Sequence, residues 1–385
     1  MKFLRYIGKK IMSQNIMNEK SITILESGLL STIQDVGRYG FQKYGVPVSG
    51  ALDNFAFRGA NLLVGNEMNA AGIEMTVIGP SIKFNYPALI SITGADLSIK
   101  LDGEKIDRWA AIQVEADSVL TSDGIQDGIR AYLAINGGIN VPMIMGSRST
   151  YIPASFGGYK GRPLMAGDTL FVGEPNPETR HQERTLPENL EPVHYGHSHV
   201  IRVVLGPQDS NFTSDAINTF FDSRYVVTNN SDRTGYRLAG PSLKHQRTAD
   251  IISDGTQIGS IQVPADGNPI ILMSDRGPTG GYAKIGTIIT SDLGFIAQSH
   301  PNDNLVFRQV GVKEAETAFI EQESILYSID PNLFINASEQ FKERLTQTNS
   351  SLSECLKDET DKLKRIATAN IRGKTFTFGI SIESN

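Results

Sequence analysis

Leu97-Ser98-Ile99-Lys100-Leu101-Asp102-Gly103 is the stretch that decides the fold class. Apolar and polar side chains alternate along its first five residues, and this period of two is typical of a half-buried β-strand. Asp102 and Gly103 follow as a dipeptide that favours a tight hairpin turn, because it tolerates positive φ. The stretch therefore predicts a strand that turns into an antiparallel hairpin.

Similar runs recur on both sides of this stretch. In residues 130–135 the side chains of Ala131, Leu133 and Ile135 share one face, and two glycines at 137 and 138 follow the run. Further short runs occur at residues 200–205, 225–228, 270–273, 285–290 and 305–307. Strands this short, at this spacing, predict β-barrels or sandwiches in preference to a parallel α/β sheet.

Two helices are predicted, one in each half of the chain. Residues 49–64 carry apolar side chains near helical spacing, and we expect Ser49 to cap this helix and Gly65 to end it. Residues 214–221 are a shorter counterpart, with Ile217, Phe220 and Phe221 facing inward. Each half is therefore expected to be a mostly β unit with one packed helix.

A chain of 385 residues exceeds one average domain, so we expect two. Residues 174–199 are polar, rich in proline and without periodicity, which is typical of a boundary. The predicted parts are an N-terminal extension (1–20), a first β module (21–185), a second β module (195–330) and a C-terminal tail (331–385). Helical segments are predicted at 313–322 and 339–366, and a last strand at 374–382.

The composition argues against several classes of function. The formal net charge is −6 and no basic run occurs, so nucleic acid is not an expected partner. Cys355 is the single cysteine and no apolar run reaches membrane-spanning length, which together predict a cytoplasmic protein without disulfides. Neither a P-loop nor a nucleophile elbow occurs. We interpret His194, His197 and His199 as solvated linker residues and predict no metal site.

Polar residues concentrate in three glycine-rich segments. In Thr32-Ile33-Gln34-Asp35-Val36-Gly37-Arg38-Tyr39-Gly40, the Arg38 guanidinium suits a carboxylate or phosphate, and Asp35 is a candidate base. An internal Asp–Arg pair that braces a bend is an equal alternative. Residues 273–282 follow an apolar strand and let backbone N–H groups approach an anion, or form a plain tight turn. Residues 146–168 place basic side chains on loops that bind an acidic substrate or are solvated surface.

These segments resemble the KipA/allophanate-hydrolase-subunit-2 family. The opening signature of the family is similar to residues 32–41 and 45–53, and its central block to residues 146–151 and 157–168. Its later blocks are similar to residues 231–240, which begin Ser231-Asp232-Arg233-Thr234-Gly235, and to residues 259–276. The motifs occur in the family order between residues 21 and 310. One departure is Pro278, which stands where the family commonly has a threonine.

The resemblance implies two cyclophilin-like β-barrel modules. Together with the residue patterns above, this predicts a mainly β fold with a few short helices and a helical C-terminal tail. It also implies the C subunit of an ATP-dependent 5-oxoprolinase, an enzyme that further requires a KipI-like B subunit and an A subunit. Such a complex hydrolyses 5-oxo-L-proline to L-glutamate with ATP and Mg²⁺. The first alternative is a KipA-type binding protein that antagonises a KipI-like kinase inhibitor. The second is a carboxyltransferase subunit of a biotin-dependent urea carboxylase, with a biotin carrier as partner.

Within the matching motifs we expect one pocket, built from loops of both modules and completed by a companion protein. The predicted catalytic residues are Asp35, Arg38 and Asp275. The predicted substrate-binding residues are Gln34, Asp53, Arg148, Ser149, Gln262, Thr279 and Tyr282. The arginines are expected to neutralise phosphate or carboxylate groups, and an aspartate to act as base or hold a metal ion.

Overall fold

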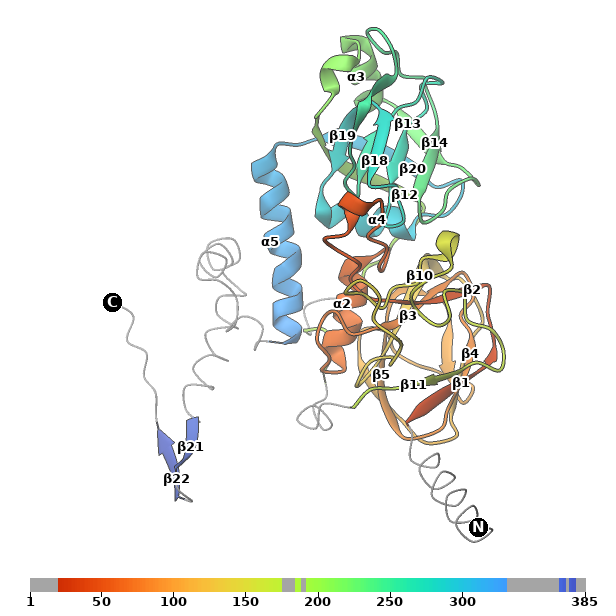
Figure 1. The fold of residues 1–385 in the computed structure, drawn as a ribbon, viewed down its shortest axis with the longest axis vertical. Helices are drawn as coiled ribbons and strands as arrows, with labels where there is room; N and C mark the ends of the chain where they lie inside the picture. The colour runs from red at the N-terminus through yellow and green to blue at the C-terminus, as the bar shows by residue number, and fades with distance from the viewer. Residues whose placement is uncertain (1–19, 175–183, 188–191, 331–366, 372–373, 379–385) are drawn as a thin grey trace. The chain divides into compact units, whose positions relative to one another are not determined.

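The computed structural model describes residues 20–174, 184–187, 192–330, 367–371 and 374–378 (Figure 1). The chain divides into two compact units, Met1–Ala315 and Glu316–Asn385. The first unit contains two β modules, each with its own apolar core. The mainly β fold with two barrel-like modules is thereby confirmed.

Two antiparallel sheets form the first module. One sheet has the strand order β11-β1-β4-β9-β6-β7, and the other has the order β2-β3-β10-β5-β8. The strands are β1 (Ser21–Glu26), β2 (Leu30–Gln34), β3 (Gly72–Thr76), β4 (Ser81–Phe84), β5 (Ala88–Asp96), β6 (Ile99–Leu101), β7 (Glu104–Lys105), β8 (Ala111–Val114), β9 (Val119–Ser122), β10 (Asp127–Ile135) and β11 (Thr169–Phe171). Helix α2 (Asn54–Leu63) packs beside β5 and β10.

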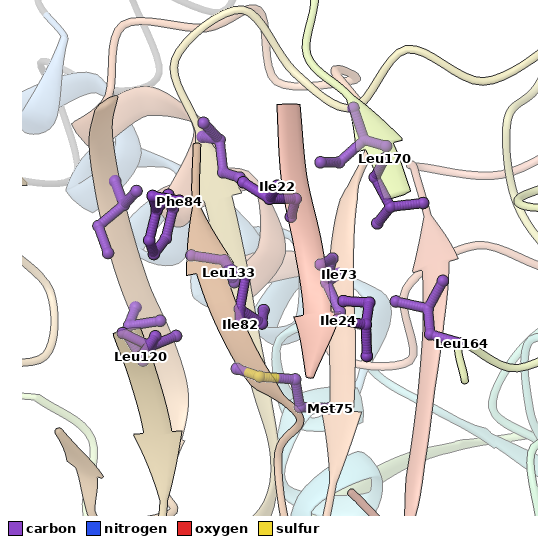
Figure 2. Close-up of a cluster of buried hydrophobic side chains, with 14 of the residues drawn as sticks. Ile22, Ile24, Ile73, Met75, Ile82, Phe84, Leu120, Leu133, Leu164 and Leu170 are labelled. Carbon is purple, nitrogen blue, oxygen red and sulfur yellow. The ribbon is translucent and has the colours of Figure 1, made fainter. Parts of the chain in front are cut away.

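Side chains from both sheets fill the core of this module. Figure 2 shows Ile22 and Ile24 of β1 facing Ile73 of β3 and Leu133 of β10. The predicted inward face of β10 is correct, because Ala131, Leu133 and Ile135 all belong to this core. The alternation read from the sequence therefore places the first sheet against the second.

The second module is a closed barrel with the strand order β12-β19-β16-β17-β14-β13-β20. Its strands are β12 (Ser198–Leu205), β13 (Arg224–Val227), β14 (Gly235–Ala239), β16 (Ser260–Gln262), β17 (Ile270–Leu272), β19 (Lys284–Ile288) and β20 (Asn304–Gln309). A parallel pairing of β12 with β20 closes the barrel. The strands β15 (Asp250–Gly255) and β18 (Thr279–Tyr282) form a separate two-stranded ribbon. Helices α3 (Ser214–Asp222) and α4 (Leu293–Gln298) complete the module.

Of the local predictions, the hairpin turn and the second helix are confirmed, and the cap of the first helix is wrong. Lys100 pairs with Lys105 across the Asp102-Gly103 turn, and both turn residues have positive φ, as predicted. Helix α3 covers the predicted residues 214–221. The prediction that Ser49 caps the first helix is wrong, because Ser49 has a φ of 56° and lies before the start of the helix. The helix begins at Asn54, and the Asp53 side chain accepts the capping hydrogen bond from the backbone N–H of Ala56.

The C-terminal part contains α5 (Val312–Ile329) and a hairpin of β21 (Ala367–Ile371) and β22 (Lys374–Phe378). Helix α5 confirms the helix predicted at residues 313–322, and β22 lies within the predicted last strand. The N-terminal extension, the helix predicted at 339–366 and Cys355 lie outside the described residues. Within the described ranges, no helix is both long and apolar enough to cross a membrane.

The two helix caps differ in how many bonds they make, which gives a test of stability. Asp53 accepts from Ala56 N at 3.1 Å, from Tyr195 Oη at 3.2 Å and from Gln298 Nε2 at 2.9 Å. Thr213 caps α3 with a single bond to Ala216 N. We expect Asp53→Ala to lower the free energy of unfolding by about 2–4 kcal/mol, and Thr213→Ala by about 1 kcal/mol. Urea denaturation of both variants checks this, and equal losses would contradict it.

Candidate functional site at the junction of the two modules

Arg233 is the residue that joins the two modules. It precedes β14 of the barrel, and its guanidinium donates to Asp275 of the same module at 2.9 and 3.2 Å. It also donates to Glu74 on β3 of the first module and to the carbonyl oxygen of Gly50 at 2.6 Å. Burial opposes the charge, but the carboxylates of Asp275 and Glu74 outweigh it and raise the pKa of Arg233.

This network continues from Glu74 into the first module. The Glu74 carboxylate accepts from the backbone N–H of Leu52 at 2.8 Å and from the Tyr132 hydroxyl at 3.1 Å. The Tyr132 hydroxyl in turn accepts from the backbone N–H of Asp53 at 2.8 Å. Burial raises the pKa of Asp53, against the hydrogen bonds that its carboxyl group accepts. Two predicted site residues, Asp275 and Asp53, are therefore linked through one buried polar network.

Asp35 lies in a second group, which holds the loop around residues 146–150. Its carboxylate accepts from the hydroxyls of Ser147 (2.7 Å) and Ser149, and from the backbone N–H groups of Arg148 (2.5 Å) and Gly37 (2.8 Å). Four donors thus converge on one buried carboxylate. In this arrangement the carboxylate positions the loop, and its catalytic role stays a prediction.

Arg38 supports the same loop from another direction. Its guanidinium donates to the carbonyl oxygens of Ile144 (3.0 Å) and Ser149 (2.9 Å) and lies over the Phe156 ring at 4.8 Å. The side chain is 0% exposed, and burial lowers its pKa although Asp35 and Asp275 oppose this shift. Arg38 and Asp35 therefore brace one loop through different atoms, which include the carbonyl oxygen and the hydroxyl of Ser149, instead of forming the ion pair considered from the sequence. An Arg38→Ala substitution removes this support, so it does not isolate a catalytic effect.

The remaining predicted residues of the first module belong to this loop group. Gln34 is fully buried, and its amide Nε2 donates to Thr32 Oγ1 at 3.0 Å and to the Thr150 carbonyl oxygen at 3.3 Å. Arg148 is half-buried, and its Nε donates to the Val141 carbonyl oxygen at 3.1 Å. The loop group reaches the junction through the chain at residues 48–51, since Ala51 N donates to the Asp35 carbonyl oxygen and Ser49 N to that of Ser274.

Gln262, Thr279 and Tyr282 form a third group at the ribbon. The Gln262 amide lies against β18, where it donates to the Tyr282 carbonyl oxygen at 3.4 Å. A Cβ on Gly280 would lie 2.2 Å from the same amide nitrogen, so glycine permits this close approach. Thr279 and Tyr282 are exposed. Within the described residues, no hydrogen bond joins these three side chains to the Asp35 loop.

Sequence reasoning missed the residues that hold these groups together. Arg233 stands inside the quoted stretch beginning at Ser231, but its partners Glu74 and Gly50 are far away in sequence. Lys284 is 2% exposed and fastens the ribbon to the barrel through Asp254, with Nζ–Oδ2 at 3.0 Å. A lysine at the start of a strand gives no signal of burial. The importance of Lys284 is visible only in the structure, where it lies opposite Gln262 in the pairing of β16 with β19.

A cleft of about 370 Å³ opens beside this network. It is lined by residues of both modules, and Asp275 is the one predicted site residue among them. Of the histidines predicted to be solvated, His197 and His194 are exposed and pair with Asp303 at 2.7 Å and Asp127 at 3.0 Å. The prediction is wrong for His199, which is buried in β12. Within the described residues, no group of three or more histidine, cysteine or acidic side chains is arranged to hold a metal ion.

The comparisons with known proteins agree with one another. Residues 44–309 match a family model described as "Carboxyltransferase domain, subdomain A and B". The chain is 35% identical over 302 residues to the 5-oxoprolinase C subunit of Escherichia coli (strain K12), covering 78% of this chain and 95% of that protein. It is 33% identical to urea amidolyase of Saccharomyces cerevisiae, covering 84% of this chain and 19% of that protein. The crystal structure of the K. lactis urea amidolyase superposes with a TM-score of 0.76 at 30% identity, covering 81% of this chain and 20% of that one.

The Asp35 loop predicts a large effect for a small chemical change. Asp35→Asn replaces an acceptor oxygen by an NH₂ group that faces donors, so we expect the free energy of unfolding to fall by about 2 kcal/mol or more. Asp117→Asn is the matched control, because Asp117 pairs with Lys83 on the surface and is expected to change stability by less than about 0.5 kcal/mol. Urea denaturation with circular dichroism measures both, and a neutral Asp35→Asn would contradict the role of this carboxylate.

The Arg233 network predicts a still larger loss. Arg233→Met leaves the carboxylates of Glu74 and Asp275 buried without their partner, which costs about 3–5 kcal/mol. Arg308 is the control: it pairs with Glu314 at 2.7 Å and both side chains are exposed, so Arg308→Met is expected to cost about 1 kcal/mol or less. Thermal unfolding followed by calorimetry compares the two variants. Similar midpoints for both would show that the modules do not depend on Arg233.

Proposed function

Because this chain belongs to the carboxyltransferase-domain family, we propose that it is the C subunit of an ATP-dependent 5-oxoprolinase. The observation that carries this proposal is the share of each relative's length that the chain covers. The match spans 95% of the E. coli 5-oxoprolinase C subunit but only 19% of urea amidolyase, at similar identity. A chain that corresponds to nearly the whole of the first protein and to a fragment of the second is better explained as a relative of the first.

The proposed reaction opens the lactam of 5-oxo-L-proline to L-glutamate, coupled to ATP hydrolysis. A lactam is a poor electrophile because nitrogen donates electrons into the carbonyl group. Transfer of the γ-phosphoryl group of ATP to the carbonyl oxygen gives ADP and creates a leaving group. Water then adds to the ring carbon, and the carbon–nitrogen bond breaks with protonation of the nitrogen, which leaves an acyl phosphate. A second water hydrolyses this acyl phosphate to the carboxylate of L-glutamate and releases phosphate.

Of the predicted catalytic residues, Asp275 is the best placed to contact a substrate, since it lines the cleft. Arg233 binds both of its oxygens and orients the carboxylate. We propose that Asp275 accepts a proton from the attacking water. Asp35 is already bound by four donors, so we propose a positioning role for it.

ATP and Mg²⁺ are proposed as requirements of the complex. Neither predicted aspartate fits Mg²⁺ in this arrangement, because Asp35 is bound by four donors and Asp275 is paired with Arg233. We therefore assign no step on this chain to the metal ion. A KipI-like B subunit and an A subunit are the proposed partners, and the cytoplasm is the proposed location.

Carboxyl transfer is a second candidate, favoured by the superposition on the K. lactis urea amidolyase. It requires biotin on a carrier protein, and it predicts transfer of a carboxyl group without release of glutamate. A KipA-type binding role instead predicts tight association with a KipI-like protein and no turnover.

Reconstitution with the two partner subunits tests the proposal. The trio is expected to release L-glutamate and ADP in equal amounts from 5-oxo-L-proline and ATP. Asp275→Asn in this chain should reduce the rate by about 100-fold or more, while size-exclusion chromatography shows intact assembly. Asp117→Asn serves again as the control and should leave the rate unchanged. Transfer of the carboxyl group from a carboxylated biotin carrier to urea, without release of glutamate, would instead support the second candidate.

A further inference from the structure

The cleft at the junction has a mixed lining. Its charged residues are Arg130 of β10, Arg233, Asp275 and the exposed Asp232, and Ile129, Ile152 and Val227 are among its apolar ones. It opens to solvent, since Thr234 on its rim is exposed. A concave site with apolar walls and a few convergent polar groups is the usual form of a small-molecule site.

Arg130 differs from Arg233 in having no acidic partner. Its Nη1 donates to the Tyr236 hydroxyl at 2.6 Å and to the Ala297 carbonyl oxygen, which are both neutral acceptors. Its Nε is buried without a hydrogen-bond partner, and no carboxylate of the described residues forms an ion pair with it. The residue is only 6% exposed. Burial opposes the charge of Arg130, but Tyr236 and the nearby Glu74 carboxylate outweigh it and raise the pKa of the guanidinium, so the charge persists. In the part of the chain that the structure describes, no carboxylate is in direct contact with this guanidinium, although buried charges normally require one.

In the described ranges, the other two buried arginines, Arg38 and Arg233, do not combine a place on the cleft with the absence of a bound carboxylate. Arg233 is bound by two carboxylates and a carbonyl oxygen. Arg38 also has one unpartnered nitrogen, Nη1, but it is fully buried and does not line the cleft. Of these three arginines, Arg130 is the one that lines the cleft and has no carboxylate, among the residues described, hydrogen-bonded to its guanidinium.

We propose that Arg130 binds the carboxylate of a small organic acid in this cleft. The planar guanidinium matches a carboxylate in geometry, and the edge containing Nε is the part that the protein leaves unused. Ile129, Ile152 and Val227 then contact the carbon skeleton of the acid. If the proposed function holds, on which the identity of the ligand rests, the acid is 5-oxo-L-proline and its lactam lies towards Asp275.

Isothermal titration calorimetry on the full chain tests this proposal with three probes. These are 5-oxo-L-proline, 2-pyrrolidinone, which has the same lactam without the carboxylate, and succinate, which has carboxylates without a lactam. We expect 5-oxo-L-proline to bind at least about 10-fold more tightly than 2-pyrrolidinone, as a charge-assisted hydrogen bond implies. Arg130→Met should remove this difference, and Arg130→Lys should retain part of it. A preference unchanged in Arg130→Met would overturn the proposal, as would failure of the wild-type chain to bind either acid.

Two further variants separate binding from folding. Thr234→Trp changes an exposed rim residue, so it should weaken the binding of the acids by about 10-fold or more while the unfolding midpoint stays unchanged. Arg237→Met removes an equal charge from an exposed position that does not line the cleft, and should leave all affinities as in the wild type. Wild-type affinity in Thr234→Trp would place the site elsewhere and overturn the proposal.

The outcomes also separate this proposal from the proposed function. Binding of succinate that depends on Arg130, without binding of 5-oxo-L-proline, would support the carboxylate site and contradict the assigned substrate. Release of glutamate by the reconstituted trio with an unchanged KM for 5-oxo-L-proline in Arg130→Met would support the enzyme and overturn the role of Arg130.

Discussion

The buried guanidinium of Arg233 is the interaction on which the junction depends. It takes one carboxylate from each module, Glu74 and Asp275, and the Gly50 carbonyl oxygen as a further acceptor. Removing three charges from water is costly, and mutual attraction offsets this cost only when the geometry satisfies all partners. Such a contact fixes a relative placement more than it adds stability. The two modules are therefore held in one register at the site where the cleft opens.

The same constraint limits which polar residues remain available for chemistry. Most of the polar side chains near the junction are occupied: Asp35 by loop donors, Glu74 by Tyr132 and Leu52, and Asp53 by its helix cap and Gln298. A buried network whose polar groups are hydrogen-bonded is rigid. It keeps Asp275 oriented beside the cleft, while unpartnered polar atoms remain around it in Arg130, Arg38 and Gln34.

Local patterns predict the strands well, because alternation and turn chemistry act over a few residues. The face of Ala131, Leu133 and Ile135 and the Asp102-Gly103 turn needed no long-range information. Ser49 does not cap the helix, because its positive φ depends on how residues 48–51 pack against Ser274, which is far away in the sequence. The sequence identifies the segments that are rich in polar residues, but it does not identify the hydrogen bonds within them. The Asp35 carboxylate accepts a hydrogen bond from the Ser149 hydroxyl, which is 114 residues away in the sequence. The spacing of residues therefore predicts neither that Asp35 braces this loop nor which charged groups surround it.

The parallel pairing of β12 with β20 has a consequence for how the protein is made. β20 is the last strand of its barrel in the chain, and it lies between the first strand, β12, and β13. During synthesis from the N-terminus, β12 and β13 thus keep an unpaired edge each until residues 304–309 leave the ribosome. Unpaired edges of this kind invite contact with other nascent chains. Closure of the barrel is accordingly a late, all-or-none event, and a chain that stops before β20 carries both open edges at once.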